Sequence, residues 1–148
     1  MYRHQVLTER IIGLAIEVHR RTGPGLLESV YAACLCFELE QAGIPLSRQV
    51  NIPVSYKSMT IPLGFRADIL VADAVIIEVK ALSVLLPVHE AQLQTYLRMS
   101  GLPVGIMMSF HALLLKDGLR IFVNLNAPGR NRRQGACYAE PWIQSPTH

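Results

Sequence analysis

Apolar residues recur along the first forty positions at spacings that predict two helices. Between Leu7 and Val18 they fall three and four residues apart, which is typical of the buried face of a helix. The Gly-Pro-Gly segment at residues 23–25 is expected to end this helix. A second helix is predicted over residues 26–41, and the glycine and the proline that follow closely are expected to end it.

The chain beyond residue 45 shows the shorter periods of β-strands. Val50, Ile52 and Val54 alternate with polar residues, as in a half-buried strand, and Pro53 indicates an edge or a bulge there. The order helix, helix, three strands, helix, two strands predicts an α/β fold, with a central mixed sheet of about five strands flanked by helices. The strands are predicted over 49–57, 59–71, 75–82, 103–110 and 119–125, and the third helix over 88–100.

The composition is that of one globular domain. The 148 residues, of which 51% are hydrophobic, suffice for one apolar core and argue against disorder. We expect residues 1–127 to form a single domain. Residues 128–148 have little periodicity, several prolines and glycines, and a basic cluster, so they are expected to be an irregular tail; the cluster is Arg130, Arg132 and Arg133.

Charge, hydropathy and cysteines narrow the class of protein. A net charge of +3 permits contact with nucleic acid but does not indicate it alone. No segment reaches the roughly 18 uncharged apolar residues of a membrane span, and charges interrupt the N-terminal segment where a secretory signal would be apolar. The three cysteines indicate neither a disulfide framework nor a zinc site. We therefore expect a cytoplasmic protein that does not contact membranes.

The segment RADILVADAVIIEVK, residues 66–80, places charges in an otherwise apolar hairpin. With a turn at residues 72–74, Asp68 is expected to lie opposite Glu78, and the register puts apolar residues on one face and charges on the other. The predicted apolar face is Phe65, Ala67, Ile69, Val71, Val75, Ile77 and Val79. The predicted polar face is Arg66, Asp68, Leu70, Ile76, Glu78 and Lys80.

Two carboxylates facing each other across a hairpin repel unless a proton or a cation lies between them. Their oxygens suit a hard divalent cation such as Mg²⁺. Lys80 projects from the same face as Glu78, where its amine could hold an attacking water and stabilise negative charge. Cross-strand ion pairs on a solvated face are the alternative, and the hairpin pattern alone does not decide between the two.

Three motifs in order along the chain resemble those of a known superfamily. Asp68, followed after nine residues by Glu78-Val79-Lys80, is similar to the signature of the PD-(D/E)XK nuclease superfamily. The segment Gly25–Tyr31, GLLESVY, resembles the motif that names the GxxExxY family within it. PVHEAQLQTYL, residues 87–97, resembles the Q-x-x-x-Y helix motif of RecB-like and related nucleases.

The resemblance implies a restriction-endonuclease-like fold and a role for each matched residue. Alternative interpretations stay open for several of them: Glu28 is also typical of an acid in a first helical turn, Tyr31 of a core aromatic residue, and Gln92 of a solvated helix residue. The implied metal ligands are Asp68, Glu78 and Glu28, the implied catalytic residues are these three and Lys80, and the implied substrate-binding residues are Gln92, Tyr96 and Arg66.

The expected function is hydrolysis of phosphodiester bonds in nucleic acid, DNA rather than RNA, with one or two Mg²⁺ or Mn²⁺ ions. So small a chain has no evident separate DNA-binding domain, and a homodimer or another partner could supply specificity. Two alternatives remain: a nuclease-fold module that binds nucleic acid or protein with little catalysis, and a metal-dependent hydrolase of another substrate.

Overall fold

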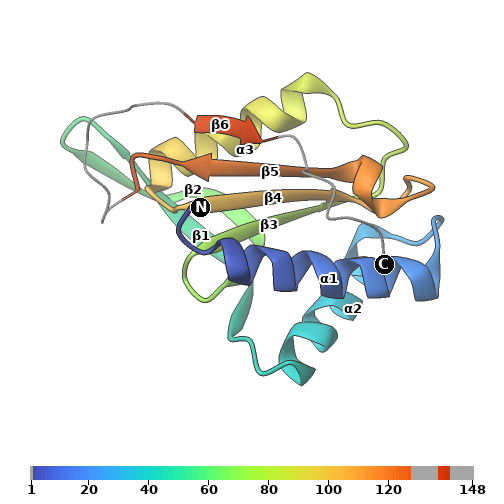
Figure 1. Ribbon diagram of the computed structural model, residues 1–148. Helices are drawn as coiled ribbons and strands as arrows, with labels where there is room; N and C mark the ends of the chain where they lie inside the picture. Colours follow the sequence, from blue (N-terminus) through green and yellow to red (C-terminus); the bar gives the residue numbers. More distant parts are fainter. Residues whose placement is uncertain (1, 128–136, 141–148) are drawn as a thin grey trace.

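The structure is a computed structural model that describes residues 2–127 and 137–140 (Figure 1). It confirms the predicted α/β fold with a mixed sheet. The described residues form three helices and six strands, together with one short 3₁₀ turn at Leu115–Gly118. The helices are α1 Gln5–Thr22, α2 Glu28–Gln41 and α3 Pro87–Ser100; the strands are β1 Leu46–Tyr56, β2 Met59–Val71, β3 Val75–Lys80, β4 Val104–Ser109, β5 Leu119–Asn124 and β6 Cys137–Glu140.

The strands lie in the sheet in the order in which they occur along the chain. All neighbouring pairs are antiparallel except β3 and β4, which are parallel. A parallel pair needs a crossover connection, and α3 supplies it. Helices α1 and α2 cover one face of the sheet and α3 the other (Figure 1).

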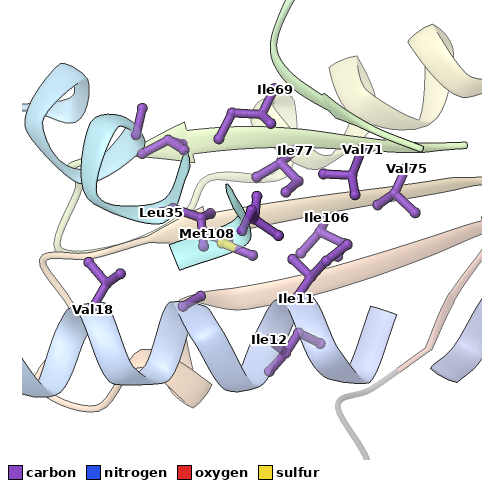
Figure 2. Packing of buried hydrophobic residues seen from close by; sticks show 14 of the residues in the cluster. Ile11, Ile12, Val18, Leu35, Ile69, Val71, Val75, Ile77, Ile106 and Met108 are labelled. Carbon is purple, nitrogen blue, oxygen red and sulfur yellow. The ribbon is translucent and has the colours of Figure 1, made fainter. Parts of the chain in front are cut away.

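The larger core lies between the sheet and the helices α1 and α2. Figure 2 shows its central side chains, with Ile11 of α1 and Leu35 of α2 lying against Ile77 of β3 and Ile106 of β4. All four are fully buried. Each such side chain contributes about 1.5–3 kcal/mol on burial, so this cluster holds β3, the strand that carries Glu78 and Lys80, firmly in place.

The predicted faces of the β2–β3 hairpin are wrong in part. The predicted register is present, with Ile69 opposite Ile77, but Phe65 and Ala67 are buried on the α3 side, whereas Ile69 is buried on the α1–α2 side. Strand β2 changes faces at Asp68, between Ala67 and Ile69, which pair with Val50 and Arg48 of β1. Gln49, between these two partners, adopts a left-handed backbone with φ of 51°. Both faces of the hairpin are consequently apolar over most of their length; Leu70 and Ile76 of the predicted polar face are buried under α3.

The predicted irregular tail is corrected at one place. Cys137–Glu140 forms β6, which pairs with β5 at the edge of the sheet. Four residues are too short a segment for an alternating pattern to reveal. Residues 128–136 and 141–148 of the expected tail, including its arginine cluster, lie outside the described residues. Among the described residues, no helix is both long and apolar enough to cross a membrane.

Candidate active site at the fork of β2 and β3

The β2–β3 ladder ends just before the charged residues. Its last pair is Ile69 with Ile77, so Asp68 and Glu78 do not form the predicted ladder pair. Instead, Asp68 Oδ2 accepts a hydrogen bond of 2.8 Å from the backbone N–H of Val79. The Asp68 carboxylate therefore occupies the position where the two strands separate, which we call the fork of β2 and β3.

Glu78 is the more deeply buried of the two acids. Its side chain and backbone are only 9% exposed, and Oε1 is buried with no hydrogen-bond partner. Burial, and then the charge of Asp68, raise the pKa of Glu78 to about 8. Burial also raises the pKa of Asp68, although the hydrogen bond from Val79 N opposes the shift. An unpartnered carboxylate oxygen in this position can accept a proton or a cation.

The alternative of ion pairs on a solvated face does not fit this geometry. In the described part of the chain the ion pairs join Glu17 to Arg20 and Arg21, and Glu90 to Arg120. None of them includes Asp68, Glu78 or Lys80. Lys80 lies near enough for its charge to oppose the rise in the pKa of both carboxyl groups, but it neutralises neither by direct contact.

Glu28 reaches the same fork from α2. It is the first residue of that helix, as the dipole interpretation expected, and its Oε1 accepts a hydrogen bond of 3.2 Å from Ala81 N, directly after β3. The charge of Glu28 contributes to raising the pKa of Asp68. The helix start thus brings a third carboxylate, from 40 positions earlier in the chain, to the two on the sheet.

The loop before α2 is fixed by the tyrosine of the same motif. Tyr31 is fully buried, and its hydroxyl donates to Gly23 O at 2.7 Å and accepts from Leu26 N at 3.0 Å. Gly25 between them has a φ of 111°, which is costly for any residue with a Cβ. Tyr31 is therefore a core aromatic residue with a satisfied hydroxyl, and together with Gly25 it sets where Glu28 begins the helix.

Sequence reasoning missed Ser109. It is buried at the end of β4 and pairs with Lys80 across the parallel ladder. Its hydroxyl accepts from Leu82 N at 3.0 Å and donates to Leu82 O, so it holds the segment that follows Lys80. The only sequence signal was one hydroxyl residue at the end of an apolar strand.

The remaining predicted site residues lie apart from the carboxyl groups. Gln92 Nε2 donates to the hydroxyl of Tyr96 at 2.7 Å, and the Tyr96 ring stacks on Phe65 at a centroid distance of 3.9 Å. Arg66 is exposed and donates to Asn51 Oδ1 at 3.3 Å. Within residues 2–127 none of these side chains is hydrogen-bonded to the acids. The structure brings together Glu28, Asp68, Glu78 and Lys80, and it does not join Arg66, Gln92 or Tyr96 to them by any hydrogen bond or ring contact within the described residues.

The donor set fits a magnesium ion better than a metal that needs many protein ligands. Within the described residues, no three His, Cys, Asp or Glu side chains are gathered closely enough to hold a metal by themselves. Mg²⁺ keeps several waters and is commonly bound through one or two carboxylates. Asp68 and Glu78 supply these, with the buried Oε1 of Glu78 still without a partner.

Comparison with known proteins agrees with this geometry. The model of the PD-(D/E)XK nuclease superfamily matches residues 5–122, which include every element from α1 to β5 except the last two residues of β5. No match was found among curated proteins or among solved structures. The mixed sheet flanked by helices is the restriction-endonuclease-like fold of that superfamily. The chain belongs to the PD-(D/E)XK nuclease superfamily.

Proposed function

We propose that the chain is a divalent-metal-dependent nuclease that hydrolyses phosphodiester bonds, and that the fork of β2 and β3 is its active site. The observation that carries the proposal is the buried carboxylate of Glu78, whose Oε1 has no partner and whose nearest charged neighbours are Asp68 and Lys80. A buried carboxyl group is costly to ionise when one of its oxygens lacks a partner. Binding of a cation during function accounts for that cost.

Asp68 and Glu78 would hold the ion, Mg²⁺ or Mn²⁺. When bound, such an ion lowers the pKa of a water molecule and neutralises charge on the scissile phosphate. Glu28 already holds Ala81 N beside the fork and would complete the acidic cluster. Lys80, half-buried at the end of β3, would orient the attacking water and stabilise the negative charge that develops on the phosphate.

Nucleic acid as the substrate is supported by membership in the superfamily, and the preference for DNA rests on the resemblance of the sequence motifs. Membership in the GxxExxY group is part of the same proposal. It is supported by the concerted roles of Gly25, Glu28 and Tyr31 in the loop and helix beside the fork. The number of ions, a homodimer and a cytoplasmic location stay predictions.

The experiment is a cleavage assay with end-labelled single-stranded DNA, duplex DNA and RNA in Mg²⁺, Mn²⁺ or chelator. We expect metal-dependent cleavage by the wild type. Lys80→Ala and Glu78→Ala should each lose at least about 100-fold in rate, as removal of one group that stabilises transition-state charge does. Lys116→Ala, an exposed lysine in the 3₁₀ turn, is the matched control and should cleave normally.

Two results would contradict the proposal. Cleavage that survives in Lys80→Ala and Glu78→Ala would place the chemistry elsewhere or in a contaminant. Binding of nucleic acid by the wild type without metal-dependent cleavage would instead support a nuclease-fold binding module.

A further inference from the structure

The outer part of the β1–β2 hairpin, residues 48–67, has an unusual charge distribution; we call it the hairpin arm. It contains none of the 11 acidic residues of the chain, and the nearest acids in sequence are Glu40 and Asp68. Its three cations are Arg48, Lys57 and Arg66. All three side chains are exposed, and none takes part in an ion pair within the described residues. The arm is therefore purely cationic.

The hairpin arm extends beyond the rest of the sheet. Strand β2 pairs with β3 only from Ile69 to Val71, whereas it pairs with β1 along nearly its whole length. The tip of the arm lies away from α1 and α2, at the left of Figure 1. On one side the arm is anchored, because Ile52 and Phe65 are buried against α3. Its other side is free to meet a partner.

The free side of the arm leads to the acidic fork. Arg66 lies on the side of β2 opposite to Phe65 and Ala67. It is two residues from Asp68, so about 7 Å of strand separates them. The side chain of Arg66 is hydrogen-bonded to Asn51 Oδ1 and not to an acid. A polymer whose reacting group lies at Asp68 would pass Arg66 first and then continue along the arm.

The tip of the arm combines a cation with apolar surface. Tyr56 and Met59 face each other across the end of the ladder, and each is 54% exposed. Lys57 lies in the turn with its ammonium 5.6 Å from the centre of the Tyr56 ring. A cation can contact the phosphates of either a duplex or a single strand, and an exposed aromatic ring beside it is typical of surfaces that also stack the bases of a single strand.

We propose that the hairpin arm docks the phosphate backbone of the nucleic acid that is cut at the fork. The inference rests on the proposed function for its substrate class and adds the element that binds the substrate. From Met59 to Asp68 the strand spans up to about 30 Å. At 3.4 Å per base pair, Lys57 would lie up to about nine base pairs from the cleaved bond.

The decisive measurement is DNA affinity as a function of salt, in chelator so that no cleavage occurs. Fluorescence anisotropy with a 20-base-pair duplex at 50–200 mM salt gives the slope of log affinity against log salt. Each lost phosphate contact should reduce that slope by about 0.9. We expect a reduction of about 0.9 for Lys57→Ala and of about 2.7 for the Arg48→Ala/Lys57→Ala/Arg66→Ala triple variant, with Lys116→Ala unchanged.

A second readout separates this inference from the proposed function. Hydrolysis of bis(p-nitrophenyl) phosphate needs the fork but offers no backbone for the arm. The Arg48→Ala/Lys57→Ala double variant, which keeps Arg66 beside the fork, should therefore retain the wild-type rate. Failure of the wild type to hydrolyse any phosphodiester would refute the proposed function while DNA binding by the arm still stood. A triple variant that folds normally, with wild-type circular dichroism, and binds DNA with unchanged slope would overturn the arm proposal. Binding of polyglutamate as tight as that of DNA would also overturn it.

Discussion

Replacing Glu78 by glutamine should stabilise the metal-free protein, and more so as the pH rises. Burial and the charge of Asp68 raise the pKa of Glu78 from 4.5 to about 8. Between these two values the native protein keeps a proton that the unfolded chain has released, so the free energy of unfolding of the wild type falls as the pH rises. Glutamine has a similar shape and no ionisable proton, so the free energy of unfolding of the variant should not fall with rising pH for this reason.

The magnitude follows from the shift. One pKa unit corresponds to about 1.4 kcal/mol, so a shift from 4.5 to about 8 costs the native state about 5 kcal/mol once the group is ionised in both states. At pH 5 less than about 1 kcal/mol of that cost is present. The difference in free energy of unfolding between the variant and the wild type should therefore grow by about 3–4 kcal/mol from pH 5 to pH 8.

The assay is urea denaturation at several pH values in chelator, followed by circular dichroism. Glu40→Gln, at an exposed position near the end of α2, is the control and should follow the wild type. If the free energy of unfolding of Glu78→Gln and of the wild type changed with pH in parallel, the reasoning would be refuted, because the pKa of Glu78 would then not be raised in the native protein.

Two further substitutions test the parts of the structure that hold the site. Ser109→Ala should lower the free energy of unfolding by about 1–3 kcal/mol, because both backbone groups of Leu82 lose their partner in a part-buried position; urea denaturation measures the loss, and an unchanged midpoint would contradict it. Gly25→Ala should cost about 1–3 kcal/mol, because φ at this position is 111°. It should also reduce cleavage by moving Glu28, whereas Gly13→Ala, inside α1 with open space around it, should do neither.

The local pattern of the sequence was sufficient to predict much of the fold. The spacing of apolar residues predicts α1 and the register of Ile69 against Ile77, and the glycine and proline after residue 41 predict the end of α2. The acids Asp68 and Glu78 could be singled out because charge in an apolar segment is costly wherever the segment lies. These features depend on residues close together in the sequence.

The features that were missed depend on contacts between distant segments. The change of faces at Asp68 goes with the left-handed backbone of Gln49 on the neighbouring strand, and no residue type at either position demands it. Glu28 lies 53 positions before Ala81, to which it is bonded; only the resemblance to a family linked it to the site. Ser109 has a partner 27 positions away, so its role is likewise set by tertiary structure.

The central claim is that Asp68 and Glu78 form a site for a divalent cation, and calorimetric titration of Mn²⁺ tests it most directly. The wild type at pH 7 should bind the ion saturably and release about one proton per ion, because a Glu78 whose pKa is about 8 is mostly protonated there; measurement in two buffers of different ionisation enthalpy detects that proton. Asp68→Ala should lose both the binding and the proton release. Absence of binding in the wild type, or equal binding in Asp68→Ala, would contradict the account.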